Sequence, residues 1–222
     1  MSTNSNRLAL AEELMLIALD DDSGSPISLP PMALELGLAA ALVGELTLEG
    51  RLDTDSDKLF VTSGSAVGDA LLDEMLADVV AESRQLPTDT WLRRIAEAGP
   101  VLRDRIAQRL VQRGVLKQTE KRLLWVFKTR VYPPTSGIEE SEVKSRIMTL
   151  LNNDDIPSAR DALLVGVLRA TGMFDVLLSG PEHERLRARI DQVADLEEIG
   201  RSLNHTVAVL QMALAAAYVG PM

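Results

Sequence analysis

The chain has 222 residues, of which 46% are apolar and 25% charged, a composition typical of a globular protein with one large domain or two small ones. Aromatic residues make up only 3%, so the core is expected to consist of aliphatic side chains, which favours helices over sheets. Cysteine is absent, which excludes disulfides, thiolate metal sites and a cysteine nucleophile.

The first part of the chain predicts helices separated by two short hairpins. Apolar residues recur at helical spacing in 7–19, and a segment rich in Asp, Gly and Pro ends that helix. Thr88 or Asp89 is expected to cap a later helix. The expected elements after the first helix are a helix at 31–48, a hairpin at 51–63, helices at 69–85, 90–98 and 101–113, and a hairpin at 115–130.

The rest of the chain predicts helices alone. Pro133 and Pro134 break the chain, and helices are expected at 139–152, 157–171, 173–179, 181–193, 195–200 and 202–218. The fold class is therefore mainly α, a single globular helical domain over 7–219 with two small β-hairpins, preceded by a disordered segment 1–6. We expect a cytoplasmic protein, because neither a secretory signal nor an apolar run of about 20 residues is present.

Two stretches repeat at a constant offset of 64 residues. Leu46, Gly50, Leu52, Lys58, Leu59 and Val61 align with Leu110, Gly114, Leu116, Arg122, Leu123 and Trp125. Each copy is an expected helix end, a glycine and a hairpin, and the residue after a helix often needs the positive φ that glycine adopts. The repeat indicates either a duplicated unit or two units that converged on the same packing.

Charge is distributed unevenly along the chain. The net charge is −10, but residues 93–130 carry +8, so the remainder carries −18. This division indicates either a negatively charged ligand or a basic helix face neutralised by acidic neighbours. The eleven basic residues of this segment are Arg93, Arg94, Arg103, Arg105, Arg109, Arg113, Lys117, Lys121, Arg122, Lys128 and Arg130.

The helix expected at 101–113 concentrates this charge. Arg105, Arg109 and Arg113 are four residues apart and share one face, whereas Arg103 lies near the helix N-terminus, where backbone N–H groups favour anions. Guanidinium groups can bind a phosphate through two parallel hydrogen bonds. The pattern predicts an anion site or, equally, ion pairs with acidic helices, and we expect all four guanidiniums to be at least partly solvent-accessible.

The second hairpin has an apolar tip between basic residues. Alternation along a strand places apolar side chains on both faces, so the core, a membrane or a partner chain has to cover one of them. Basic residues around such a tip suit an anionic lipid interface, and a second copy of the chain could cover it in a homo-oligomer. The tip consists of Leu123, Leu124, Trp125, Val126 and Phe127.

Residue patterns typical of catalysis or metal binding are sparse. The two histidines, His183 and His205, lack metal-ligand spacing, and no glycine-rich phosphate loop is present. Asp69 and Asp73 lie one turn apart at a helix start, where carboxylates either bind a cation or, as we favour, stabilise the helix. We therefore expect a protein that is not an enzyme and holds no cofactor or metal.

Four ordered stretches between Leu8 and Tyr218 resemble the Golgi phosphoprotein 3 family: LALAEELMLIALDD at 8–21, GLAAALVGELTLEGRL at 37–52, GDALLDEML at 68–76 and RDRIAQRLVQRGVL at 103–116. The resemblance implies a mainly helical, non-enzymatic protein that binds phosphatidylinositol 4-phosphate, docks on membranes through an apolar hairpin and recruits protein clients. The Ala- and Leu-rich helices lead us to expect a bacterial member.

The resemblance also implies where the lipid headgroup binds. The family's pocket uses one tryptophan and three arginines, and the aligned positions here are, in chain order, Pro30, Ala39, Pro100 and Arg103. Only Arg103 has the residue type of the family. We expect it to contribute to an anion site, with Arg51, Arg94 and Arg105 as candidates for the missing arginines.

The resulting expectation is a peripherally membrane-associated adaptor that binds anionic lipid through a basic helix and an apolar hairpin. Protein clients and self-association through the hairpin are further expected partners. The alternative is a winged-helix-like nucleic-acid-binding protein, in which the basic helix would enter a groove and the hairpin would form the wing. The apolar wing tip and the strongly acidic chain argue against nucleic acid.

Overall fold

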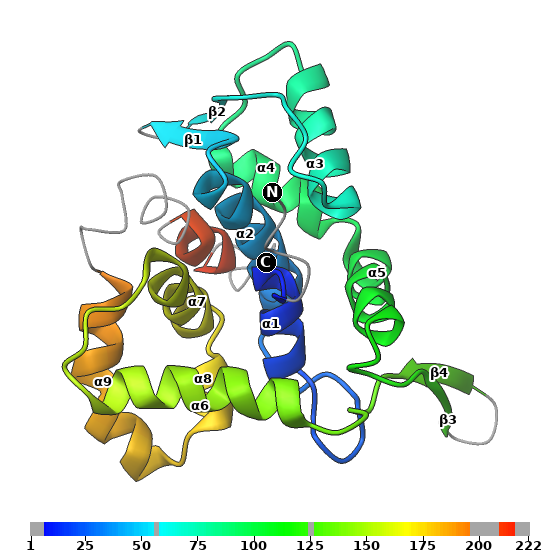
Figure 1. Ribbon diagram of the computed structural model, residues 1–222, viewed down its shortest axis with the longest axis vertical. Coiled ribbons are helices and arrows are strands. Elements are labelled where there is room, and N and C mark those ends of the chain that lie inside the picture. The colour runs from blue at the N-terminus through cyan, green and yellow to red at the C-terminus, as the bar shows by residue number, and fades with distance from the viewer. Residues whose placement is uncertain (1–6, 56–57, 124–126, 196–208, 216–222) are drawn as a thin grey trace, which may run out of the picture.

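The computed structural model describes residues 7–55, 58–123, 127–195 and 209–215 (Figure 1). Within these ranges helices predominate, and the strands form two separate two-stranded antiparallel sheets, so the predicted mainly α domain with two hairpins is confirmed. The expectation of disorder in residues 1–6 lies outside the described part of the chain.

The elements follow the predicted order closely. The helices are α1 (Leu10–Ile17), α2 (Ala33–Leu48), α3 (Ala70–Ala81), α4 (Thr88–Ala96), α5 (Gly99–Gln112), α6 (Ile138–Asn152), α7 (Ala159–Ala170), α8 (Met173–Leu177) and α9 (Gly180–Ala194). The strands are β1 (Leu52–Asp55), β2 (Lys58–Val61), β3 (Thr119–Leu123) and β4 (Phe127–Val131). Residues 209–215 are also helical.

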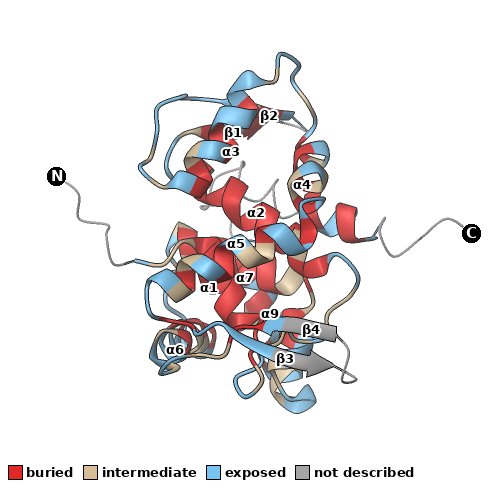
Figure 2. Cartoon of the chain, turned by 90° about the vertical axis from the view of Figure 1, so that its right-hand side faces the viewer, coloured by how far each residue is buried: buried red, intermediate tan, exposed pale blue. Residues whose placement is uncertain are grey.

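Helices α1 and α2 form the centre of the molecule. Helix α2 contacts α1, α3, α4, α5 and α7, and its residues from Leu36 to Leu46 are buried (Figure 2). A helix that is apolar on every face has to be surrounded by other elements, which explains this position. Helix α1 is buried along its whole length, including Glu12 and Glu13. These two carboxylates therefore need partners inside the fold.

The two hairpins lie at different edges of the molecule (Figure 1). In the first, Leu52 pairs with Val61, and in the second, Thr119 pairs with Val131. The second hairpin projects beyond α5, away from the central helices (Figure 1). Its base is anchored to the body, because the backbone N–H of Tyr132, directly after β4, donates to the carbonyl of Gly24 at 2.8 Å.

The sequence repeat corresponds to two equivalent helix ends. Gly50 and Gly114 both have a positive φ, 64° and 77°. The residue after each glycine donates its N–H to an equivalent helix carbonyl, that of Leu46 at 2.8 Å and that of Leu110 at 2.9 Å. The strands that follow differ, because β1 begins at Leu52 but β3 only at Thr119. The likeness is therefore clearest at the helix end.

Several predicted helix boundaries differ from the observed ones, and the largest difference is at the end of α3. The helix expected to reach residue 85 ends at Ala81, because the following residues run beside β2, where Leu59 donates its N–H to the carbonyl of Leu86. The next helix begins at Thr88 rather than at 90, and Pro87 occupies its N-cap position without a side-chain cap. Neither Thr88 nor Asp89 therefore caps it.

The C-terminal predictions are tested only in part. The helix expected at 195–200 lies almost wholly outside the described residues, as does His205. Residues 209–215 agree with the helix expected at 202–218, and Val209, Leu210, Ala213 and Leu214 are buried in the core. Among the helices that the structure describes, none combines the length and the apolar character needed to cross a bilayer.

Candidate anion-binding site

Glu12 is a buried carboxylate that binds two arginines of the basic stripe, the name we use for Arg105, Arg109 and Arg113 on one face of α5. Its side chain is 2% exposed and accepts three hydrogen bonds, from the Ala9 backbone N–H at 2.8 Å, Arg109 Nε at 3.2 Å and Arg113 Nη1 at 2.8 Å. Helix α5 packs against α1, so arginines spaced one turn apart on α5 reach the same carboxylate. These ion pairs compensate for the burial of Glu12.

Further arginines converge on the start of α1 from its other side. Arg146 of α6 donates to Glu13 at 2.7 Å. Arg160 of α7 donates to Glu45 at 2.5 Å, and Glu45 also accepts the backbone N–H of Leu10 at 2.6 Å. The sequence signal for this network is a pair of glutamates within a helix that is otherwise apolar.

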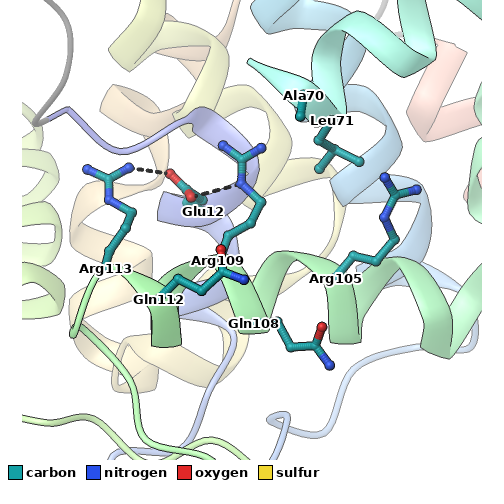
Figure 3. Close-up of a pocket in the computed structure, with 8 residues that line it drawn as sticks. All are labelled: Glu12, Ala70, Leu71, Arg105, Gln108, Arg109, Gln112 and Arg113. Carbon is teal, nitrogen blue, oxygen red and sulfur yellow. Dashed lines mark hydrogen bonds and ion pairs between the residues drawn. The ribbon is translucent and has the colours of Figure 1, made fainter. Parts of the chain in front are cut away.

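A hollow of about 420 Å³ lies over the basic stripe (Figure 3). Both Nη atoms of Arg105 donate to Glu74, at 3.0 and 2.6 Å, and both Nη atoms of Arg109 donate to Asp69. The hydrogen bonds from Arg105 lower the pKa of Glu74 below its usual value. The hollow is lined by Glu12, Ala70, Leu71, Arg105, Gln108, Arg109, Gln112 and Arg113.

Ion pairing is therefore what the structure shows for the stripe of Arg105, Arg109 and Arg113. The three side chains are partly solvent-accessible, as predicted, but carboxylates of α1, α3 and the α3 N-cap already bind their guanidiniums. Of the two alternatives predicted for the stripe, ion pairs with acidic helices are therefore the one that the structure supports. The nucleic-acid alternative thereby loses the basic helix that would enter a groove.

Asp69 has the capping role expected of it. Its side chain accepts the backbone N–H groups of Leu71 and Leu72 at 3.0 and 3.1 Å. Burial raises its pKa, but the hydrogen bonds from Arg109 and from the helix N-terminus outweigh this effect and lower it. Within the described ranges, no group of three or more potential metal-ligating side chains is found.

A second hollow, of about 500 Å³, surrounds Arg103. Its wall combines α1, the α1–α2 loop, the start of α5 and the end of β4. It is therefore formed by segments far apart in the sequence, and the lining combines apolar and charged side chains. The lining residues are Met15, Leu19, Pro26, Pro100, Arg103, Asp104, Arg130 and Tyr132. We call this cavity the Arg103 hollow.

The two arginines of the Arg103 hollow retain unused hydrogen-bond donors. Arg103 Nε lies 3.3 Å from Glu35, whereas its Nη atoms donate no hydrogen bond to a described carboxylate. Arg130 donates to Asp104 through Nη1 alone, at 3.0 Å, and Tyr132 donates its hydroxyl to the same carboxylate at 3.1 Å. Arg103 is 29% exposed and Arg130 55%. Both guanidiniums can therefore still bind an anion.

The other candidate arginines lie elsewhere. Arg105 follows Arg103 by two residues and so points about 200° away around the helix, into the first hollow. Arg94 of α4 pairs with Glu82 at 3.4 Å and lies over the ring of Trp91. Arg51 stands at the base of the first hairpin and, like Arg94, does not line the Arg103 hollow. The expected set is therefore not brought together.

Arg130 is the functional candidate that sequence reasoning did not assign. It belongs to the basic segment, but its position after the hairpin does not indicate from the sequence that it lies near Arg103. The antiparallel pairing of β3 with β4 returns Arg130 to the start of α5. The hairpin itself is confirmed, with Leu123 paired to Phe127, but residues 124–126 and the side chains of both strand ends lie outside the described part.

The fold and the site define a mainly α protein with a cationic hollow at the base of a projecting hairpin. Residues 10–219 match the family model described as Golgi phosphoprotein 3 (GPP34), and the chain belongs to this family, as its four ordered stretches predicted. It is 28% identical over 170 residues to vacuolar protein sorting-associated protein 74 of Eremothecium gossypii. That match covers 68% of this chain and 51% of the relative, so the chain spans about half the length of the curated relative.

Proposed function

We propose that the chain is a non-enzymatic adaptor that attaches peripherally to membranes by binding a phosphate-bearing lipid headgroup in the Arg103 hollow. The observation that carries the proposal is that Arg103 and Arg130, from α5 and β4, line one hollow and keep guanidinium donors unused. Membership of the Golgi phosphoprotein 3 family supports it. The name of the curated relative places that protein in vacuolar protein sorting, and we infer a comparable role with protein clients for this chain.

The chemistry of the hollow suits a phosphate with an apolar neighbour. Two guanidiniums offer two bidentate contacts, and Asp104, which holds Arg130 and Tyr132 in place, limits the positive charge. By the family resemblance, Pro30, Ala39 and Pro100 take the positions of the other headgroup residues. Charge rather than headgroup identity therefore sets the affinity, so binding should be salt-sensitive, with little preference for phosphatidylinositol 4-phosphate.

Replacing both Arg103 and Arg130 with glutamine is expected to weaken binding to vesicles of phosphatidylcholine and phosphatidylglycerol by about tenfold or more. Each lost charge-assisted hydrogen bond contributes about 1.5–3 kcal/mol, and 1.4 kcal/mol corresponds to a factor of ten. The measurement is vesicle flotation at low and at raised salt. The matched control is Arg94→Gln with Arg105→Gln, which changes the net charge equally but leaves the Arg103 hollow intact.

Equal losses in the two double variants would show that net charge alone binds the membrane, contrary to the proposal. The same assay with vesicles containing phosphatidylinositol 4-phosphate tests selectivity. A preference of about 100-fold over phosphatidylserine, equivalent to about 2.7 kcal/mol, would contradict the expectation of charge-based binding.

We further propose that the tip from Leu123 to Phe127 supplies the apolar contact, with lipid or with a second copy of the chain. Strand β4 joins this tip to Arg130, so a headgroup held in the hollow would position the hairpin at the same surface. Lipid and a second copy of the chain would then compete for the same tip. Because a tip bound to lipid could not contact another copy, the lipid-bound form would be monomeric.

Trp125→Glu is accordingly expected to weaken both self-association and vesicle binding while leaving the helical fold intact. Burial of a large apolar side chain contributes roughly 1.5–3 kcal/mol, which is enough for a single residue to matter. Sedimentation velocity measures self-association, flotation measures vesicle binding, and circular dichroism measures the helical content. Val61→Glu, at the exposed end of the other hairpin, is the control. Unchanged association of the Trp125 variant would exclude the tip as the interface, and unfolding would assign the tip to the core.

A further inference from the structure

The turn between α1 and α2 forms part of the wall of the Arg103 hollow. Residues 20–25 are closed by hydrogen bonds from Asp20 N–H to the Ser25 carbonyl at 2.9 Å and from Gly24 N–H to the Asp20 carbonyl at 2.8 Å. Leu19 and Pro26, which flank this turn and form a β-bridge, both line the hollow. The position of the turn therefore sets the shape of the hollow.

On its other side the same turn meets α6 through a pair of carboxyl groups. Asp21 hydrogen-bonds to Glu140, a residue that is only 5% exposed. Lys144, one turn further along α6, contacts both, with Nζ 3.1 Å from Asp21 Oδ1 and close to Glu140 Oε1. These three groups thus link the turn to α6.

Among the described residues that line the small cavity around these three groups, of about 320 Å³, no other side chain is titratable. Asp20 and Asp22 flank Asp21 on the turn, and Asp20 accepts the backbone N–H of Ser23 at 2.8 Å. The charge at the junction therefore depends on Asp21, Glu140 and Lys144. The remaining lining residues are Pro134, Gly137, Ser141, Ser145 and Met148.

Two hydrogen-bonded carboxyl groups share one proton. Burial first, and then the hydrogen bond to Asp21, raises the pKa of Glu140 to about 7, whereas the hydrogen bond with Glu140 lowers the pKa of Asp21. Below this pH, neutral Glu140 donates to the Asp21 carboxylate, whose charge Lys144 balances. Above it, two carboxylates repel each other beside a single lysine.

The sign of the effect follows from the two pKa values of Glu140. In the unfolded chain the group has its ordinary pKa of 4.5, so between that pH and about 7 the native state binds the proton and the unfolded state does not. The stabilisation that the protonated pair provides is therefore complete at low pH and is lost as the pH rises through 7.

We propose that the Asp21–Glu140 carboxyl pair is a proton-sensitive latch that holds turn 20–25 against α6 and so controls the Arg103 hollow. Its consequence for membrane attachment rests on the function proposed above. Loss of the proton loosens the turn that carries Leu19 and Pro26, and anionic vesicles bind less tightly at pH 8 than at pH 6.

Hydrogen–deuterium exchange of the full chain at pH 6 and pH 8, corrected for the intrinsic pH dependence of exchange, tests the latch directly. We expect opening of residues 19–26 to increase by about tenfold, because the closed turn loses the proton of Glu140 between pH 6 and about 7, and one pH unit corresponds to a factor of ten. Glu140→Gln, which keeps a neutral hydrogen-bond donor, should abolish this pH response. Glu142→Gln, at an exposed position of the same helix, should preserve it.

Flotation with phosphatidylglycerol vesicles, whose charge is constant in this range, tests the consequence. The wild type should bind less tightly at pH 8, and Glu140→Gln should bind equally at both values. Exchange in residues 19–26 that is independent of pH, or a pH response that persists in Glu140→Gln, would overturn the latch. Absence of vesicle binding at either pH would instead refute the proposed function, and the exchange result would still decide on the latch.

Discussion

Replacing Glu12 with glutamine is expected to lower the free energy of unfolding by about 2–4 kcal/mol. The variant keeps the side-chain volume but leaves Arg109 and Arg113 next to each other without the carboxylate that both bind. Breaking a buried ion pair costs about 3–5 kcal/mol, and partial exposure of the two arginines reduces this figure. Urea denaturation followed by circular dichroism measures the change.

Glu74→Gln is the matched control for this prediction. Glu74 pairs with the neighbouring arginine of the same stripe, Arg105, but both side chains are about half exposed. Its replacement should cost less than about 1 kcal/mol. A loss below 1 kcal/mol for Glu12→Gln as well would mean that the stripe does not stabilise the fold, and that its guanidiniums are available to ligands after all.

Gly24→Ala is expected to destabilise the protein by about 2–5 kcal/mol and to weaken vesicle binding as well. Gly24 has φ of 62°, and a Cβ atom there would lie 2.1 Å from the backbone nitrogen of Pro133. A left-handed conformation costs a non-glycine residue about 1–2 kcal/mol, and overpacking against rigid backbone adds about 1–3 kcal/mol. The contact displaced is the one that joins the turn to the base of the second hairpin.

Gly50→Ala separates the cost of the left-handed conformation from the cost of overpacking. Gly50 has a similar φ of 64°, but nothing lies within 4 Å of the added Cβ. It should therefore show only the conformational cost, about 1–2 kcal/mol, and bind vesicles normally. Thermal unfolding measures the stability of both variants, and flotation measures their vesicle binding. Equal destabilisation would show that the turn moves freely away from Pro133 and does not fix the hollow.

The order and type of the elements were predictable because their signals are local. The apolar periodicity of α1, the predominantly apolar α2 and the glycine at each repeated helix end depend only on neighbouring residues. The errors arose where a distant segment intervened. Residues after Ala81 leave the helix to run beside β2, a contact that no local pattern encodes.

The candidate site was predictable in kind but not in membership. The crowding of arginines on and after α5 indicated an anion site or ion pairs. The structure shows ion pairs on one face of the helix, and the hollow around Arg103 on another face is the anion site that we propose. Helical geometry separates Arg103 from Arg105, but it does not reveal which face meets carboxylates. The packing of α5 against α1, together with the α3 residues paired to Arg105 and Arg109, decides that.

The sequence by itself determined the fold class, the family and the presence of a strongly basic segment in an acidic chain, because these follow from composition, periodicity and ordered motifs. Only the tertiary structure decided which charged side chains are paired with other charged side chains within the fold. It buries Glu12 against Arg109 and Arg113, returns Arg130 on β4 to the side of Arg103, and places Asp21 against Glu140. Each of these contacts joins residues far apart in the chain, and their energies depend on burial and distance, which a linear pattern does not contain.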